Sequence, residues 1–343
     1  MTLDEAVALS LIPDLSRVGL ADRLRAADPV LLEEARRLHP RAHVVRLRAE
    51  AAGIGVLAWD DPRFPAALLA IPDTPPVLWY RGVLDALRAP AVAVVGSRTA
   101  SAVALETAAR LGADLAARGI TVVSGLARGV DSAAHRGALG SGRTVAVLGS
   151  GVGRIYPHEH TTLAGEIARE GMVMSEYPPD TPPLAFHFPM RNRLISGLSR
   201  AVVVIEANEK SGSLITAACA LDQGREVMAV PGSVLGGRNR GAHALIRDGA
   251  TIVESADDIV EALGWSGGAA AGSGNAPRDR RPGASGDPLL RLMDEGQTYD
   301  LDGLAGVSGV DVVRLLPRLL ALELGGLVQR VGGGRFMRLT RTC

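Results

Sequence analysis

The sequence has almost no lysine. Of its 37 basic residues, Lys210 is the single lysine and all others are arginine. The 37 acidic residues balance them, so the formal net charge is zero, which excludes a uniformly basic nucleic-acid binder but not a local basic patch. One interpretation is that Lys210 occupies a position where a compact ammonium group is required. The other is that it survives by chance on a solvated surface.

Cysteine and long apolar runs are also scarce. Cys219 and Cys343 alone form neither a disulfide framework nor a zinc site, which favours a reducing compartment. No apolar run approaches the roughly 20 residues that a membrane helix needs, and the acidic start of the chain is unlike a secretory signal. With 47% hydrophobic residues, the 343-residue chain has enough apolar side chains for more than one folded core. We therefore expect a cytoplasmic protein of several domains with no membrane partner.

Composition and periodicity divide the chain into four parts. Residues 1–80 show short helical spacing, typical of a sterile-alpha-motif-like or helix-hairpin-helix-like domain, and end in a proline-punctuated connection. Residues 81–265 are predicted to form a Rossmann-like domain. Residues 266–287 are rich in glycine, alanine and serine, which predicts a flexible linker. Residues 288–343 have the outline of a winged helix, with three helices and a terminal β-hairpin.

Short β-branched runs alternate with helical stretches in the second part. The runs are apolar on both faces, as in strands of a parallel sheet that helices cover on both sides. The pattern predicts an α/β fold with a doubly wound, mostly parallel sheet. The expected strands are 91–95, 120–123, 144–148, 171–174, 201–205 and 226–230, and the expected helices are 100–117, 129–139, 160–170, 190–199 and 212–223. Ligands of such sheets bind at the carboxyl ends of the strands.

Glycine-rich or cationic loops follow several of these strands. Where such a loop opens a helix, free amide groups and the helix dipole favour a phosphate. A lysine or arginine in the loop adds a charge, and serine supplies a helix cap. The candidate nucleic-acid-binding residues in these loops are Gly96, Ser97, Arg98, Lys210, Ser211, Gly212, Arg238 and Arg240.

The segment 186–200 holds three arginines and no acid. Phe188 precedes an expected helix whose first turn carries Arg191, Asn192 and Arg193. Cations at a helix N-terminus oppose the helix dipole, so we expect an anion near them. The alternative is a solvated arginine face. Together with the strand loops, this segment predicts an electropositive groove that fits the extended phosphates of single-stranded nucleic acid.

Motifs for a bound cofactor are incomplete. Residues 149–153 resemble a dinucleotide fingerprint, but Arg154 occupies the place of the third glycine, and no helix is expected to follow. The residues before Lys210 do not form a Walker A loop. We therefore predict that the protein uses neither NAD nor ATP, and no other cofactor.

Motifs for catalysis or a metal are incomplete as well. Ser124, Asp131 and His135 invite comparison with a hydrolase triad, but no G-x-S-x-G elbow is present. A tight turn in which Asp131 and His135 fix the loop is the favoured interpretation. The remaining histidines of interest lack the carboxylate or cysteine spacing of a metal site; they are His158, His160 and His187. We predict no catalytic residue and no metal.

Taken together, the motifs resemble those of the DprA/Smf family. They are GSR at 96–98, SGLARGVDSAAHRGAL at 124–139, FPMRNRLISGLS at 188–199, EKSGSLITA at 209–217 and VPGS at 230–233. The resemblance implies a homodimer that binds single-stranded DNA during natural transformation and loads the RecA recombinase onto it. It implicates Arg98, the Phe188–Arg193 block and the loop 210–212 in a basic DNA pocket. Binding of double-stranded DNA stays open.

Two other hypotheses stand beside this one. A phosphoribohydrolase-type enzyme on a related Rossmann-like fold would carry a PGG-x-GT-x-x-E block, but Ala217 and Ala218 follow Thr216 here, so the catalytic glutamate is missing. Alternatively, the winged helix is the main DNA binder. Its candidate recognition helix, 308–324, balances acids against arginines, which does not favour DNA reading.

Overall fold

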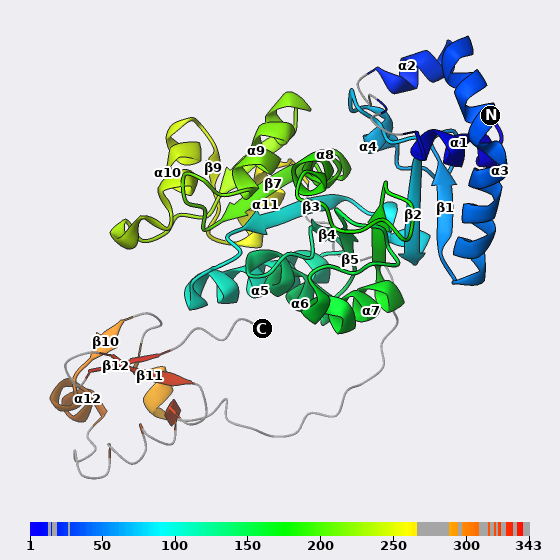
Figure 1. Ribbon diagram of the computed structural model, residues 1–343. Helices are drawn as coiled ribbons and strands as arrows, with labels where there is room; N and C mark the ends of the chain where they lie inside the picture. The colour runs from blue at the N-terminus through cyan, green and yellow to red at the C-terminus, as the bar shows by residue number, and fades with distance from the viewer. Residues whose placement is uncertain are drawn as a thin grey trace. The chain divides into compact units, whose positions relative to one another are not determined.

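Short runs of valine and alanine form the parallel strands of the central sheet (Figure 1). The strands expected from the sequence are β3 (Ala91–Gly96), β4 (Thr121–Ser124), β5 (Thr144–Val147), β6 (Met172–Ser175), β7 (Ala201–Ile205) and β8 (Glu226–Ala229). Every residue of β4, β5, β6 and β7 is buried, because helices cover both faces of the sheet. The predicted α/β fold with a doubly wound, mostly parallel sheet is confirmed.

The computed structural model describes part of the chain, in two units. The described residues are 1–12, 15, 19–26, 28–265, 288–293, 297–308, 315, 319, 322–323, 327–331 and 335–338. The units are Met1–Ser273 and Gly274–Cys343. The predicted linker 266–287 and most of the predicted recognition helix 308–324 lie outside the described residues. The division at residue 80 and the winged helix stay predictions.

The order of the strands places a switch point between β3 and β7. The sheet runs β1-β2-β6-β5-β4-β3-β7-β8-β9, where β1 is Gly55–Ala58, β2 is Val77–Gly82 and β9 is Thr251–Ile252. From β3 the chain winds outward to β6, then returns to β7 on the other side of β3 and winds the other way. β3 therefore pairs in parallel with both β4 and β7. Connections that diverge from two adjacent strands leave a crevice at their carboxyl ends.

Helices form a layer on each face of this sheet. One layer contains α5 (Ala102–Ala117), α6 (Val130–Leu139) and α11 (Ala256–Ala262), which share a core with Val92 and Val94. The other contains α8 (His187–Leu198) and α9 (Ser213–Asp222), which share a core with Ala93 and Val95. Alternate residues of β3 thus face opposite layers, as the two-residue period of a strand requires. The remaining helices of this region are α7 (Thr161–Glu170) and α10 (Arg240–Arg247).

Two strands at one edge of the sheet were missed in the sequence. β1 and β2 are antiparallel to each other, and β2 pairs antiparallel with β6. The sequence analysis treated the region around β2 as a proline-punctuated connection, because prolines precede Val77 directly. In Figure 1 the N-terminal helices lie beside these strands; they are α1 (Leu3–Ser10), α2 (Leu20–Arg25), α3 (Pro29–Ala51) and α4 (Ala66–Leu69).

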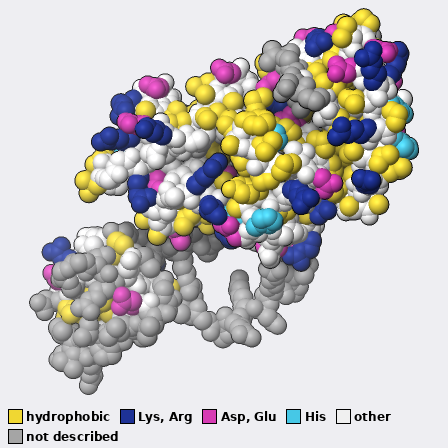
Figure 2. Space-filling view, viewed as in Figure 1, with side chains coloured by type: hydrophobic (Ala, Val, Ile, Leu, Met, Phe, Trp, Pro, Cys, Tyr) yellow, Lys and Arg dark blue, Asp and Glu magenta, His cyan; other side chains and the backbone are white. Residues whose placement is uncertain are grey.

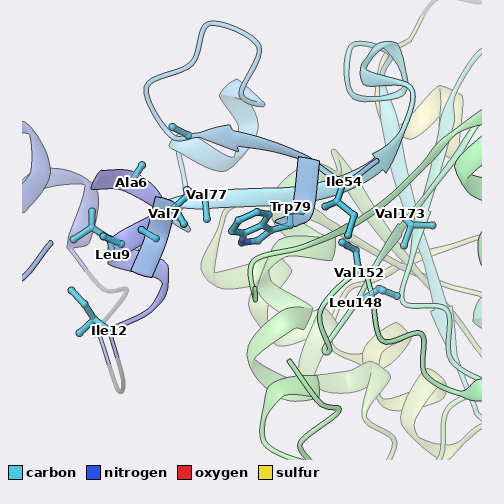
Figure 3. Packing of buried hydrophobic residues seen from close by; sticks show 14 of the residues in the cluster. Ala6, Val7, Leu9, Ile12, Ile54, Val77, Trp79, Leu148, Val152 and Val173 are labelled. Carbon is cyan, nitrogen blue, oxygen red and sulfur yellow. The ribbon is translucent and has the colours of Figure 1, made fainter. Parts of the chain in front are cut away.

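A buried tryptophan joins the N-terminal helices to the sheet (Figure 3). Trp79 of β2 is 0% exposed and belongs to one apolar cluster with Val7 and Leu9 of α1. The same cluster includes Leu148 and Val152, which follow β5. Burying an aromatic side chain of this size excludes a large apolar area from water. The N-terminal helices and the sheet therefore share a core.

The second unit contains a small antiparallel sheet. Its strands β10 (Thr298–Tyr299), β12 (Arg335–Arg338) and β11 (Val328–Val331) lie in that order. The strand pair expected near the C-terminus is present as β11 and β12, and α12 (Leu301–Ser308) is a helix of the same unit. Phe336 is 1% exposed in the core of this unit. In the described parts of both units, no helix is long and apolar enough to cross a membrane.

Candidate functional site

A cavity of about 390 Å³ opens at the switch point of the sheet. The loops after β3, β4 and β7 and the first turns of α8 form its walls. We call it the switch-point cavity. Of the residues predicted from the sequence, those that line it are Gly96, Ser97, Arg98, Phe188, Arg191, Asn192, Lys210, Ser211 and Gly212. The fold therefore brings together three segments that are far apart in the sequence.

The end of β3 lies very close to the end of β7, and glycine makes this approach possible. A Cβ atom at Gly96 would overlap the carbonyl oxygen of Ile205. One residue further, the amide of Ser97 donates to the carbonyl oxygen of Glu206 over 2.8 Å. A larger residue at position 96 would force the two strands apart and widen the crevice.

The exposed Arg98 and the half-buried Phe188 form a pair of cation and ring at the cavity. The guanidinium carbon of Arg98 lies 5.8 Å from the centroid of the Phe188 ring, within the range of a cation–π interaction. The ring of Tyr156 lies 5.5 Å from that of Phe188. Arg98 is exposed, and it forms no ion pair with any residue that the structure describes. The pair thus presents a free positive charge beside two aromatic rings.

The loop after β7 contributes the lone lysine. Lys210 is exposed, and its backbone amide donates to the side-chain oxygen of Asn208 over 2.9 Å. The side-chain amide of Asn192 on α8 donates to the carbonyl oxygen of Gly212 over 3.3 Å, which joins the two walls of the cavity. Within the described part of the chain, the Lys210 ammonium has no ion-pair partner. The charge of Lys210 is therefore available to a ligand.

Arg191 lies buried beneath the cavity, with 3% of its surface exposed. It donates to the carbonyl oxygen of Val147 at the end of β5. Burial lowers its pKa from 12.5 to about 10, an effect that the charge of Asp131 opposes. Arg191 therefore stays protonated at neutral pH. Its Nε atom makes no hydrogen bond with the described residues.

Asp131 at the start of α6 partly balances this buried cation. Its carboxylate accepts hydrogen bonds from the amides of Gly125, over 3.0 Å, and Ala127, over 3.3 Å. Burial raises the pKa of Asp131, whereas the charge of Arg191 lowers it. Asp131 thus fixes the loop after β4, the role that the sequence suggested for it. With Arg98 and Lys210 at the rim, cations outnumber acids among the residues lining the cavity.

The structure does not bring Arg193 into the cavity. Its side chain points to Glu176, whose carboxylate lies 2.6 Å from Nη2, and to Asp73, whose carboxylate lies 3.0 Å from Nε. The segment around Arg193 contains no acid, but the fold supplies two from elsewhere. Arg193 therefore forms a buried ion-pair network that holds α8, and we leave it out of the proposed site.

The two arginines of the loop after β8 also lie outside the switch-point cavity. Arg238 donates to the carbonyl oxygen of Thr99 over 2.8 Å and lies 3.7 Å from a carboxylate oxygen of Glu206. It lines a neighbouring cavity of about 270 Å³. Arg240 is exposed at the start of α10. Arg238 therefore braces the loop after β3 from outside the switch-point cavity.

Helix α8 starts earlier than the sequence suggested. It begins at His187, so that Pro189 occupies the first turn, where a proline does not break a helix. Phe188 is consequently a helical residue, and Arg191 lies in the second turn. The opposition between Arg191 and the helix dipole is therefore weaker than expected. The reason to expect an anion is therefore the arrangement of cations around the cavity more than the helix dipole.

Three contributors to the site escaped sequence analysis. Tyr156 follows the glycine-rich loop after β5, and its aromatic character was the available signal. Gly125 permits the burial of Arg191, because a Cβ atom there would overlap the guanidinium group. Glu206 accepts a hydrogen bond from the amide of Ser101 over 3.0 Å and so positions the start of α5. Nothing in the local sequence pointed to the last two roles.

Two of the three histidines considered for a metal, His160 and His187, have structural partners, as does His135, which was considered for a hydrolase triad, whereas His158 is exposed. His135 lies 2.7 Å from the Thr144 hydroxyl, His160 lies 2.9 Å from the carbonyl oxygen of Leu126, and His187 lies 3.1 Å from that of Gly149. Within the described ranges, no group of three or more histidine, cysteine or acidic residues is arranged to hold a metal ion.

On the face shown in Figure 2, lysine and arginine side chains form separate groups among apolar and acidic ones. No single basic surface covers the molecule in this view, in line with its zero net charge. The favourable positive charge of the candidate site thus comes from a few residues placed by the fold.

Comparison with known proteins gives consistent matches. Residues 55–264 match a family described as DNA recombination-mediator protein A. The chain is 42% identical over 290 residues to Protein Smf of Escherichia coli K12, which covers 83% of this chain and 77% of that protein. It is 45% identical over 201 residues to DNA processing protein DprA of Streptococcus pneumoniae, covering 58% and 71%.

Solved structures agree with these matches. The X-ray structure of DNA processing protein A from Streptococcus pneumoniae is similar, with a TM-score of 0.62 and 39% identity over 72% of this chain and 87% of that chain. A structure that addresses the single-stranded DNA binding mode of DNA processing protein A from Helicobacter pylori has a TM-score of 0.56 and 29% identity. It covers 61% of this chain and 95% of that chain.

Proposed function

Since the chain belongs to the DNA recombination-mediator protein A family, we propose that it binds single-stranded DNA, without sequence specificity, in the switch-point cavity. The observation that carries this proposal is the convergence of Arg98, Lys210 and the Phe188 ring on one cavity. Cations beside an aromatic ring are the groups that bind single strands, because they contact the two features that every nucleotide shares, a phosphate and a base face.

In this proposal the phosphates lie against the rim. Arg98 forms bidentate hydrogen bonds to one phosphate, and Lys210 acts as a point charge on another. Backbone amides at the starts of the helices after β3 and β7 add donors. Arg191 contributes the field of a buried cation, which water and salt screen less than a surface charge. Lack of contact with base edges explains why no sequence preference is expected.

The rings of Phe188 and Tyr156 supply the base-binding part. Stacking of a base on an aromatic side chain contributes about 1–3 kcal/mol and tolerates every base. The Arg98 guanidinium, already near the Phe188 ring, keeps the aromatic face and the phosphate contact in register. A nucleotide is thus held at both ends.

The family consists of recombination mediators that bind DNA and are not enzymes. The prediction of a non-catalytic protein is therefore confirmed at the level of the family. The phosphoribohydrolase hypothesis loses its support, because the required glutamate is also missing from the start of α9.

We extend the proposal to a role in natural transformation, in which the bound strand is protected and RecA is loaded onto it in the cytoplasm. The family description as a recombination mediator supports this step. We also propose a homodimer, as the resemblance implies. Exposed apolar side chains after β8 favour self-association, with Val234 82% and Leu235 79% exposed. Strand-exchange assays with RecA test the loading of RecA, and sedimentation equilibrium tests the homodimer.

The binding proposal is tested by fluorescence anisotropy with a labelled oligothymidylate over a series of salt concentrations. Because each neutralised phosphate releases counterions, the affinity is expected to fall with a log–log slope of about −0.7 per phosphate. The variant Arg98→Ala/Lys210→Ala is expected to lose affinity and to show a shallower slope. Arg110→Ala, a change of the same charge type on α5, serves as the control. A flat salt response in the wild type would overturn the proposal.

A further inference from the structure

A second and larger cavity, of about 1020 Å³, lies next to the switch-point cavity. Its walls are α3, the end of β2, the loop 176–181 and the start of α8. We call it the α3–α8 cavity. His187 and Met190 of α8 line this cavity, whereas Phe188 and Arg191 line the switch-point cavity. The start of α8 therefore separates the two cavities, with one face of the helix turned to each.

Helix α3 presents two arginines to the α3–α8 cavity. Arg41, Val45, Arg48 and Ala52 line it, with the spacing of four, three and four residues that places side chains on one helix face. Arg41 and Arg48 are exposed. Within the described part of the chain their side chains form no ion pair and no hydrogen bond, unlike the side chain of Arg46, which bonds Asp4 and Glu50. Two guanidinium groups thus face the cavity without a protein partner.

Arg81 at the end of β2 adds a third cation to the wall. Its Nε atom is buried and has no hydrogen-bond partner among the described residues. Desolvating a guanidinium nitrogen without a partner is unfavourable. The position therefore suits an anion that enters the cavity and accepts from this group.

The acids on the wall are mostly engaged. Asp73 and Glu176 line the cavity, but both carboxylates contact Arg193, at 3.0 Å and 2.6 Å. Asp180 is the remaining carboxylate in the lining. With Arg193 included, four cations stand against three acids around the cavity, because Arg193 neutralises only one of its two carboxylate partners, so the net charge is positive by one.

A column of rings lies at the α8 side of the cavity. The Tyr177 ring stacks on His187 at 3.9 Å, and Phe186 meets His187 edge-on at 4.5 Å. Phe186 is 64% exposed, which is high for a large aromatic side chain. Its ring offers a platform on which a nucleobase can stack.

We infer that the α3–α8 cavity is a second nucleic-acid subsite, in which Arg41 and Arg48 bind phosphates and Phe186 stacks a base of the same strand that occupies the switch-point cavity. This inference rests on the proposed function. The strand passes over the first turn of α8, where Phe186 and Phe188 flank His187. A continuous strand is favoured over a free nucleotide, because the aromatic side chains of the two cavities, Phe186 and Phe188, adjoin at the start of α8.

The test compares oligothymidylates of about 4 to about 20 nucleotides, a span that covers known single-strand site sizes. The variant is Arg41→Gln/Arg48→Gln, and the matched control is Arg36→Gln/Arg37→Gln, two exposed arginines of the same helix. We expect the variant to bind short oligonucleotides as the wild type does. For long ones its affinity falls several-fold, and its log–log salt slope shrinks by about 1.4, or about 0.7 per phosphate. The control matches the wild type at every length.

A second variant, Phe186→Ala, separates stacking from charge. Because Phe186 is exposed, its replacement by alanine is expected to leave the fold intact. Thermal melting followed by circular dichroism checks that the variant is folded. It is expected to weaken the binding of long oligonucleotides without changing the salt slope, because no phosphate contact is lost.

The outcomes are distinguishable. If the wild type binds no oligonucleotide, the proposed function fails. If the wild type binds but Arg41→Gln/Arg48→Gln behaves like it at all lengths, or weakens short and long strands equally, the second subsite is wrong and the proposed function stands. If that variant loses binding of thymidine monophosphate but not of long strands, the occupant is a free nucleotide, which also overturns the inference.

Discussion

The guanidinium carbon of Arg98 lies 5.8 Å from the centroid of the Phe188 ring, although the two residues belong to different connections of the sheet. Arg98 follows β3, and Phe188 belongs to the first turn of α8. They meet because the parallel strands end at one edge of the sheet, so that the loop after β3 and the start of α8, which follows β6, lie together at the switch point. A positive charge and a base-sized aromatic surface therefore meet at the one edge of the fold where ligands are expected.

Replacing Arg98 by alanine removes a phosphate contact and the cation–π pair. We expect an affinity for single-stranded DNA about five- to tenfold lower and a log–log salt slope smaller by about 0.7, the value for one phosphate. Anisotropy titrations at several salt concentrations measure both quantities. Arg110→Ala on α5 is the control, and an unchanged slope in Arg98→Ala would show that this residue contacts no phosphate.

Replacing Phe188 by alanine removes the proposed stacking surface. The expected loss of binding free energy is about 1–3 kcal/mol for one base, without a change of the salt slope. Phe188→Trp keeps a larger ring and is expected to retain affinity. The same titrations apply, and equal losses in the alanine and tryptophan variants would argue against stacking.

A methyl group at Gly125 would overlap the Arg191 guanidinium. Gly125→Ala is therefore expected to destabilise the protein by about 1–3 kcal/mol, the usual range for overpacking a core. Urea unfolding measures the change. Gly165→Ala in α7 is the matched control, because a Cβ atom there has no neighbour within 4 Å, and alanine favours a helix. Equal stability of Gly125→Ala and the wild type would contradict the packing described for Arg191.

Asp131 gives the stability of the protein a defined pH dependence. Burial raises its folded pKa above the ordinary value of 3.8, so the folded state binds a proton more tightly than the unfolded state. Its contribution is therefore most favourable below 3.8 and is lost as the pH rises through the folded pKa. Relative to Asp131→Asn, the wild type is therefore expected to lose stability as the pH rises from 3.8 through the folded pKa of Asp131. Urea unfolding of both proteins from about pH 4 to 8 tests this, and a difference that grows in the opposite direction would contradict it.

Deleting Gly274–Cys343 removes the second unit. If the switch-point cavity is the main binding site, the shortened chain is expected to keep most of its affinity for single-stranded DNA. The alternative, in which the predicted winged helix is the main DNA binder, requires that binding is lost. Native-gel shifts with a fixed oligothymidylate distinguish the two, with circular dichroism as a check of folding.

The central sheet was predictable because its signal is local. Runs such as Val92–Val95 and Val202–Ile205 are short, rich in valine and apolar on both faces, which is typical of strands in a covered parallel sheet. β2 was missed because its prolines suggested a connection and because its role depends on pairing with β6, which lies far along the chain. Tertiary pairing of that kind leaves no trace in a short window of sequence.

The site was predictable to the extent that it consists of loops after strands. Arg98, Lys210 and Phe188 meet as expected, because parallel strands end at one edge. Arg193 carried the same signal as Arg191, but its partners Asp73 and Glu176 come from other parts of the fold. The lone lysine lies in the cavity lining, and that a compact ammonium group is needed there stays a prediction.

A crystal structure of the protein with a short oligothymidylate tests the central claim most directly. The account predicts phosphates in contact with the side chains of Arg98 and Lys210 and one thymine stacked on Phe188, in the cavity between the ends of β3 and β7. An oligonucleotide bound elsewhere, with this cavity empty and Arg98 still free, would contradict it.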